Sequence, residues 1–194
     1  VRNLFILIVS FFIIRKKHGS YYGPKKYQPY LFGRSFFGFL GLITLFYASS
    51  HAAQGDVTVL NKLSPIFVTL LAAVFMKEKL SPIQIPALVL SVLGAFIVFR
   101  PSFQSDPFPL IVALLSAITS GIAYTFLGYF KGKVDGITVI MHFSTFSVFG
   151  SLPFVIGNFV MPDLRQFLLL MLISLFGSFG QVFITYAHRF APAS

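Results

Sequence analysis

The sequence has no cysteine and few charged side chains. Of its 194 residues, 10% are charged, and only five are acidic. An ordinary soluble domain carries about a quarter charged residues, so the composition excludes that class. Without cysteine, neither a disulfide framework nor a thiolate metal site can form.

The scarce acids also argue against an enzyme. All five fall in loops or at the ends of apolar segments: Asp56, Glu78, Asp106, Asp135 and Asp163. The sequence also has no cluster of histidines. A hydrolase or metalloenzyme needs a nucleophile with its base, or several metal ligands, converging at one place. We therefore expect a protein that is not an enzyme and that binds no metal and no cofactor.

Apolar residues make up 56% of the chain, enough for several helices of about 20 residues that each span a bilayer. Hydropathy predicts an all-α polytopic membrane protein with about seven spans, over residues 1–14, 33–52, 57–76, 82–100, 107–130, 136–159 and 164–188. The first is shorter than a spanning helix. Its basic cluster follows the apolar run rather than preceding it, which is not the pattern of a signal peptide.

The formal charge of +10 predicts an orientation. With the 15–34 loop inside, eleven Lys and Arg residues lie on the cytoplasmic side; Arg2, Arg100 and Arg165 lie outside, and Lys62 lies within a span. This bias follows the positive-inside rule, with the chain starting outside and ending inside. Nucleic-acid binding explains the charge less well, because the basic residues are scattered over separate loops. The 15–34 loop is also able to attract anionic headgroups, although a solvated loop is the simpler interpretation.

The sequence contains a weak internal repeat. Shifting it by 139 positions aligns residues 35–55 with 174–194, with seven identities in 21. The matches are Ser35 with Ser174, Phe37 with Phe176, Gly38 with Gly177, Gly41 with Gly180, Tyr47 with Tyr186, Ala48 with Ala187 and Ala52 with Ala191. The copies are five crossings apart, so one is inverted relative to the other. Inverted repeats are typical of secondary transporters.

The stretch from Asn61 to Phe67, continuing from Leu70 to Ser81, resembles the fourth helix of the EamA-type permeases, a family of the drug/metabolite transporter superfamily. The resemblance lies in a Ser-Pro pair and in an acidic motif at the end of the helix. Gly94–Pro101 resembles the fifth helix of that family, and Arg189–Ser194 the end of the eighth. The resemblance implies two inverted repeats of five helices. Residues 1–105 would be the first repeat without its first helix, and 106–194 the second without its last two, so that the chain holds helices two to eight.

The most informative candidate site lies at Asn61, Lys62, Ser64 and Pro65. A charge about 8 Å into a span is a functional candidate, although the Lys62 stem can also snorkel to the interface near Asp56. Pro65 has no N–H to give to the Asn61 carbonyl, which predicts a loosened turn. We hypothesise that this turn contacts an anionic or carboxylate-bearing substrate. The alternative is an ordinary kink whose carbonyl is satisfied by neighbouring side chains.

Other polar residues on apolar spans are candidates for lining a cavity: Tyr47, Tyr124, His142, Gln181 and Tyr186. His142 can couple transport to protons, but a neutral His bonded to a neighbouring helix is the favoured interpretation. The tyrosines can equally be interface anchors. The small residues Gly38, Gly41, Gly177 and Gly180, and the series Ala113, Ala117 and Gly121, are interpreted as helix-packing surfaces.

These features predict a permease that moves a small metabolite or drug-like solute by alternating access. It is expected to be a multi-pass protein of the plasma or bacterial inner membrane, with the lipid bilayer and a small-molecule substrate as partners and no nucleic acid. A homodimer is left open. The alternative is a seven-helix receptor or sensor, for which an inverted repeat offers no evident benefit.

Overall fold

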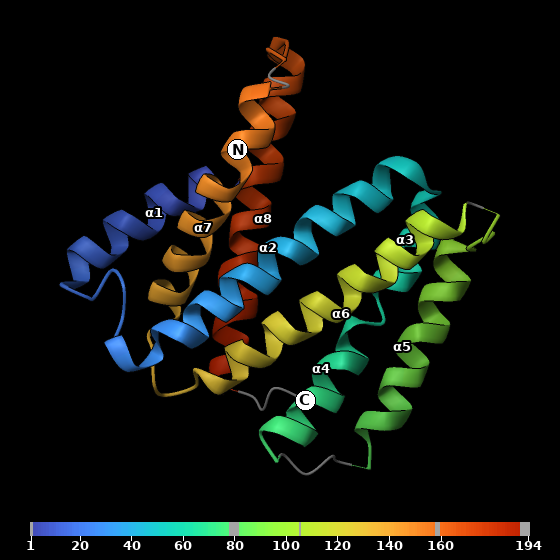
Figure 1. The fold of residues 1–194 in the computed structure, drawn as a ribbon, viewed down its shortest axis with the longest axis horizontal. Helices are drawn as coiled ribbons and strands as arrows, with labels where there is room; N and C mark the ends of the chain where they lie inside the picture. Colours follow the sequence, from blue (N-terminus) through green and yellow to red (C-terminus); the bar gives the residue numbers. More distant parts are fainter. Residues whose placement is uncertain (1, 78–81, 105, 158–159, 191–194) are drawn as a thin grey trace. The chain divides into compact units, whose positions relative to one another are not determined.

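The computed structural model describes residues 2–77, 82–104, 106–157 and 160–190. Its helices are α1 (Arg2–Lys17), the short 3-10 helix η1 (Lys25–Tyr27), α2 (Gln28–His51), α3 (Gln54–Asn61), α4 (Ser64–Phe75), α5 (Gln84–Phe99), α6 (Pro107–Tyr129), α7 (Gly136–Gly157) and α8 (Leu164–Phe190) (Figure 1). Two parts of the quoted family motifs, residues 78–81 and 191–194, lie outside the described residues.

The predicted all-helical membrane architecture is confirmed at the level of a polytopic bundle. Five helical segments of the described chain are long and apolar enough to cross a bilayer: Lys25–His51, Gln54–Phe75, Pro107–Tyr129, Gly136–Gly157 and Leu164–Ala187. The first and fourth predicted spans form shorter helices, α1 and α5, of 16 residues each. The third predicted span is two helices, because the chain is interrupted after Asn61.

Local chemistry explains several helix ends. A capping box starts α8: the Gln166 amide donates to Asp163 Oδ1 at 2.7 Å, and the Asp163 amide donates to Gln166 Oε1 at 3.1 Å. At the end of α5, Arg100 adopts a left-handed conformation with φ 43° and precedes Pro101, which disfavours continuation of the helix. Gly132, with φ 70°, allows the tight turn between α6 and α7.

The helices divide into two units. The first holds the described residues up to Phe36 together with those from Phe130 onward. Here α1 packs against α7 and α8, and α7 packs against α8. Ile6, Ile14, Ile137 and Ile140 form its buried cluster. The Thr138 hydroxyl in the first turn of α7 donates to the Ser20 carbonyl at 2.8 Å, so the loop after α1 lies against the start of α7.

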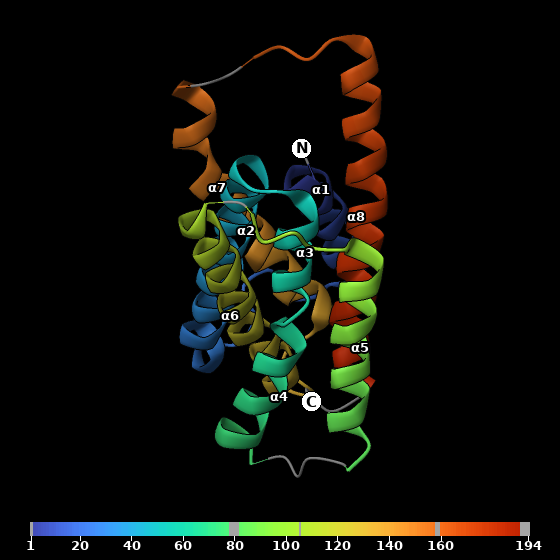
Figure 2. The ribbon, with the colours of Figure 1, turned by 90° about the vertical axis from the view of Figure 1, so that its right-hand side faces the viewer.

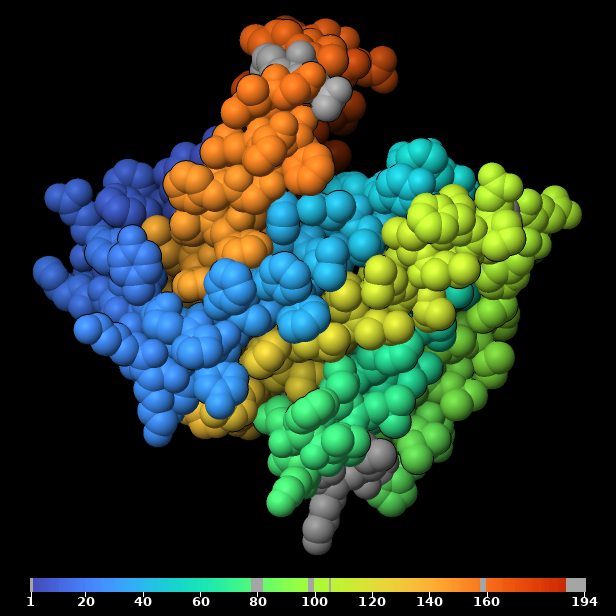
Figure 3. All heavy atoms as spheres, in the orientation of Figure 1, coloured from blue at the N-terminus to red at the C-terminus, as the bar shows by residue number. Residues whose placement is uncertain are grey.

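The second unit holds the described residues from Phe37 to Tyr129. In it, α6 packs against both α3 and α4, and α5 packs against α3. Figure 3 shows the side chains of α4 in teal meeting those of α6 in yellow. Ala48, Val57 and Ala113 form a buried cluster between α2, α3 and α6. The loop before α6 meets the first turn of α3, because the Ser102 amide donates to Asp56 Oδ1 at 2.7 Å.

Small residues form the predicted packing surface on α6. Ala113 and Ala117 are fully buried. A Cβ atom added to Gly121 would lie 2.6 Å from the Cβ of Phe67 and 3.3 Å from the amide nitrogen of Val68, so α4 occupies the space next to this glycine. On α2, Gly41 likewise faces Ser120 and Thr119.

The packing interpretation holds for only one of the two α8 glycines. A Cβ atom at Gly177 would lie 2.8 Å from Cδ of Arg2, whereas a Cβ atom at Gly180 would meet no atom within 4 Å. Gly180 therefore does not form the close contact that its repeat mate Gly41 forms.

Replacing Gly121 by Ala should separate α4 from α6, because the new methyl group meets a Cβ and a backbone nitrogen rather than a flexible chain end. We expect the free energy of unfolding to fall by about 1–3 kcal/mol. Unfolding in mixed detergent micelles, followed by circular dichroism, measures this change.

Gly94→Ala on α5 is the matched control, because a Cβ atom there meets nothing within 4 Å. Helix propensity alone predicts that this variant gains about 0.5–1 kcal/mol. Equal stability changes in the two variants would contradict the packing role of Gly121.

Candidate functional site

The predicted loosened turn is present between α3 and α4 (Figure 2). The Lys62 amide donates to the Thr58 carbonyl at 3.0 Å, and the Leu63 amide donates to the Leu60 carbonyl at 3.1 Å. The first of these bonds spans four residues and is α-helical, whereas the second spans three residues and gives the end of α3 a 3-10 turn. Because Pro65 is the second residue of α4 and has no N–H, it cannot donate to the Asn61 carbonyl.

The side chain of Asn61 is not free at this turn. Its Nδ2 donates to the Ser116 hydroxyl on α6 at 3.0 Å, and that hydroxyl donates to the Ala113 carbonyl at 2.7 Å. Ser116 is fully buried. Asn61 therefore ties the interruption to α6, a structural role that the sequence alone did not indicate.

Lys62 lies at the interruption as an exposed residue, as does Pro65, whereas Ser64 is half-buried. Asp56, which sequence analysis placed near the snorkelling lysine, is fully buried at the start of α3. Its carboxylate accepts hydrogen bonds from the Ser102 amide at 2.7 Å and, more weakly, from the Ser102 hydroxyl at 3.5 Å. Asp56 thus acts as an anchor for the loop before α6.

The two other predicted residues of this unit lie on α2 and α6. The Tyr47 ring stacks on His51 with 4.3 Å between centroids and meets Phe108 edge-on at 6.0 Å. Such an aromatic group near a helix end is typical of an interface anchor. Tyr124 is half-buried on α6.

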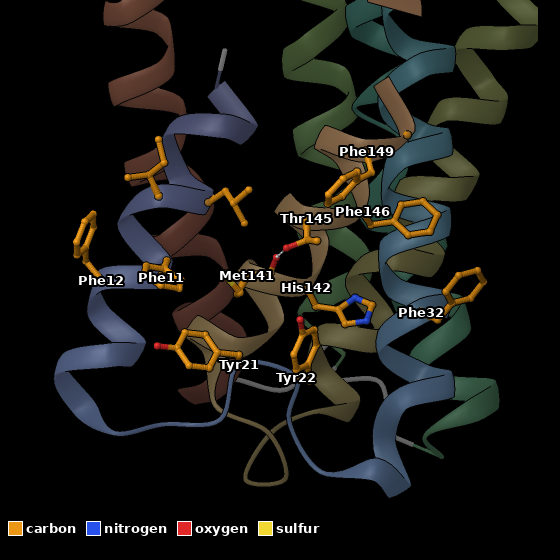
Figure 4. Close-up of a pocket in the computed structure, with 13 residues that line it drawn as sticks. Phe11, Phe12, Tyr21, Tyr22, Phe32, Met141, His142, Thr145, Phe146 and Phe149 are labelled. Atoms are coloured by element: carbon orange, nitrogen blue, oxygen red, sulfur yellow. Dashed lines mark hydrogen bonds between the residues drawn. The ribbon is translucent and has the colours of Figure 1, made fainter. Parts of the chain in front are cut away.

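The first unit contains a cavity of about 820 Å³. Its lining is mostly aromatic, with contributions from α1, the loop after it, the start of α2 and one face of α7 (Figure 4). His142 is the predicted site residue among the lining groups. Its Nδ1 is hydrogen-bonded to the Ser35 hydroxyl at 2.8 Å, which agrees with the favoured interpretation of a histidine bonded to a neighbouring helix.

Gln181 and Tyr186 lie on α8 of the same unit and are not among the residues that line the cavity. Tyr186 packs against the isoleucine cluster, next to Gly136. Gln181 Nε2 is buried without a hydrogen-bond partner, and so are the hydroxyls of Ser144 and Ser147 on α7. Nearly all buried polar groups are hydrogen-bonded in proteins, so these three are unusual.

The nine predicted residues are therefore divided between the units. Six belong to the second unit and three, His142, Gln181 and Tyr186, to the first.

Sequence reasoning missed Ser116 as the partner of Asn61 and the aromatic lining of the cavity. It also counted Arg34 as a loop residue, whereas Arg34 is 3% exposed within α2, with its guanidinium carbon 4.6 Å from the Phe143 ring centroid. Across the part of the chain that the structure describes, no three His, Asp or Glu side chains are grouped to hold a metal.

The fold and these features define a multi-pass helical membrane protein with an interrupted spanning helix. The model of the EamA-like transporter family matches residues 1–100, which is more than half of the chain. The chain belongs to this family, so the resemblance found in its residues is confirmed, and the family is one of transporters rather than enzymes.

Proteins of similar sequence agree with the assignment to this transporter family. The chain is 31% identical over 168 residues to the pseudopaline exporter CntI of Pseudomonas aeruginosa, covering 86% of the chain and 59% of the exporter. It is 28% identical to an uncharacterized transporter of Helicobacter pylori, covering 98% of the chain and 65% of that protein. It is 27% identical to human solute carrier family 35 member G1, covering 97% and 56% respectively. The chain thus spans roughly 60% of the length of these relatives.

Ser116→Ala should leave the Asn61 amide without its buried acceptor. Hydrogen bonds between membrane helices contribute modestly, so we expect a loss of about 0.5–2 kcal/mol in the free energy of unfolding. Unfolding in mixed micelles measures it. Ser50→Ala is the control, because Ser50 is exposed and bonds only within its own helix. An unchanged stability for Ser116→Ala would show that the Asn61 contact does not hold the two helices together.

Proposed function

We propose that this chain works in a permease that carries a small solute across the membrane by alternating access. The observation that carries the proposal is the interruption between α3 and α4 in a chain of the EamA-like transporter family. Transporters commonly bind their cargo where a spanning helix is broken, because unwound backbone and polar side chains are available there. That one relative is named as an exporter supports a solute-carrying role. No feature favours the receptor alternative.

The substrate is proposed to be anionic or carboxylate-bearing. Lys62 supports this choice, because it is an exposed cation at the interruption within the apolar segment Gln54–Phe75. A charge inside a membrane segment is costly unless it faces water or a ligand. In this proposal Lys62 attracts the anion, Ser64 donates a hydrogen bond, and Pro65 keeps the Asn61 carbonyl accessible.

The other candidates are assigned to the walls of the pathway. Tyr47 and Tyr124 belong to the second unit, and His142, Gln181 and Tyr186 belong to the first. Each is proposed to contact the substrate within its own unit. The buried Gln181 Nε2 and the unpartnered hydroxyls of α7 support a polar interior in that unit. A passing solute or water would supply the hydrogen bonds that these groups do not make within the protein.

The proposed architecture is two inverted five-helix repeats, with residues 1–105 in the first and 106–194 in the second. In this scheme α1 and α5 also cross the membrane, giving seven crossings. The family match over residues 1–100 supports the first boundary. The repeat mates Ser35 and Ser174 are both buried, at 0% and 1% exposure, which also supports the repeat.

Lys62→Gln in the full-length protein should weaken uptake of an anionic substrate at least tenfold in kcat/KM, because a charge-assisted contact is lost. Lys62→Arg should retain most of the activity. The matched control is Lys77→Gln, which removes an exposed lysine beyond the end of α4. Transport in proteoliposomes and binding by thermal shift measure the effect. Unaltered uptake and binding in Lys62→Gln would refute the proposed site.

The proposed orientation is testable because the sequence has no cysteine. Single cysteines at Gln104 or Met161 should react with a membrane-impermeant maleimide in intact cells. Single cysteines at Lys16 or Lys133 should react only after permeabilisation. The reverse pattern would invert the orientation, and labelling of all four positions in intact cells would contradict the positive-inside assignment.

A further inference from the structure

The aromatic cavity of the first unit is an elongated groove between α1 and α7. Tyr21 and Tyr22 lie at its loop end, and Phe149 lies toward the opposite end (Figure 4). One wall is made by Phe11, whose ring is 5.4 Å from that of Tyr21. On the other side, the Phe32 and Phe146 rings meet edge-on at 5.4 Å. The groove thus offers an apolar channel along the helices rather than an enclosed polar site.

The rim of this groove is exposed in the described structure. Phe12 is 62% exposed and Phe149 is 66% exposed. Phe12 belongs to α1 and Phe149 to α7. In the proposed scheme, in which both helices cross the membrane, their exposed faces meet the hydrocarbon. An apolar molecule that resides in the bilayer can therefore enter the groove from the side.

The loop end of the groove is strongly basic. Residues 15–34 contain six Lys or Arg and no Asp or Glu. Five of these are exposed: Arg15, Lys16, Lys17, Lys25 and Lys26. The loop is held against α7, since Thr138 donates to the Ser20 carbonyl and the Gln28 amide donates to the Tyr22 carbonyl within the loop. Tyr21 and Tyr22, which line the groove, stand in the chain between the two groups of basic residues, Arg15–Lys17 and Lys25–Lys26, so the charges flank the loop end of the groove in the sequence.

We propose that the groove binds an anionic phospholipid of the cytoplasmic leaflet. One acyl chain lies along the aromatic channel, and the phosphate of the headgroup is bound by the basic residues of the 15–34 loop. Basic clusters immediately cytoplasmic of a membrane helix attract anionic lipids. The apolar lining recognises the chain and the loop recognises the charge, so neither a neutral lipid nor a soluble anion satisfies both parts.

The same charges argue against a cationic aromatic solute. An aromatic lining alone suits a cation through cation–π contacts. Here, however, the segment that contains the loop end of the groove carries five exposed positive charges and no acid, which disfavours a cation on that side. The anionic lipid is the occupant that matches both the lining and the charge.

Lipid occupancy can be measured by fluorescence, because residues 1–194 contain no Trp and a single introduced Trp reports on its own surroundings in this part of the protein. Phe149→Trp places a reporter in the groove, and Phe183→Trp places one on an exposed part of α8 that does not line it. The full-length protein is reconstituted with a small fraction of phosphatidylglycerol or phosphatidylcholine that carries brominated chains, and the parent protein is used for subtraction. We expect phosphatidylglycerol to quench the groove reporter at several-fold lower mole fraction than phosphatidylcholine, and the two lipids to quench the α8 reporter equally.

Removing the charges tests the headgroup part of the site. Replacing Lys16, Lys17, Lys25 and Lys26 by Gln should lower the preference for phosphatidylglycerol at the groove by at least about tenfold, whereas Arg165→Gln should not change it. Native mass spectrometry of the same variants gives an independent count of retained lipids. Any of three results would overturn the proposal. The two lipids quench the groove reporter equally, the preference for phosphatidylglycerol survives the charge removal, or no lipid quenches the groove reporter. The last result would mean that protein fills the groove.

Discussion

The contact between α6 and the α3–α4 pair is the constraint on which the second unit depends. Within a bilayer, apolar side chains gain little by leaving lipid, so helices associate through close packing and hydrogen bonds. Gly121 provides the close approach to Phe67, and Ser116 provides an acceptor for Asn61. These two contacts lie on either side of the interruption at Lys62. They allow a spanning segment to be broken while its two parts stay attached to one continuous helix.

The polar groups of the helices follow from the same requirement. Because lipid offers no hydrogen-bond partners, polar groups must be satisfied inside the protein. Several hydroxyls donate to the carbonyl four residues earlier, including those of Thr69, Thr125 and Ser174. The buried hydroxyls of Ser144 and Ser147 do not. These exceptions in the first unit, the buried Gln181 amide and the exposed Lys62 in the second unit are features of the described chain that apolar packing does not explain.

The candidate site combines residues of two different kinds. Some of them shape the helices: Pro65 removes a donor, and Asn61 binds α6. Others are proposed to present chemistry, as is Lys62 at its exposed position within an apolar segment. The sequence identified both kinds of residue, since a proline and a charge within an apolar segment can be found from the sequence alone. They did not separate the two roles, because a side-chain amide serves packing or binding according to which neighbour it meets.

The sequence by itself determined the all-helical, multi-pass character of the chain through its hydropathy. Pro65 determined the loosened turn, and the motif residues determined membership of the transporter family. Each of these depends on local composition or on matched residues. The tertiary structure decided that Asn61 bonds to Ser116, that Asp56 is an anchor for Ser102, and that Arg34 is buried against Phe143. It also showed that Gly41 and Gly180 have unequal surroundings despite their alignment. These outcomes depend on which faces of distant helices meet, and the period of one helix carries no information about the neighbour that will cover it.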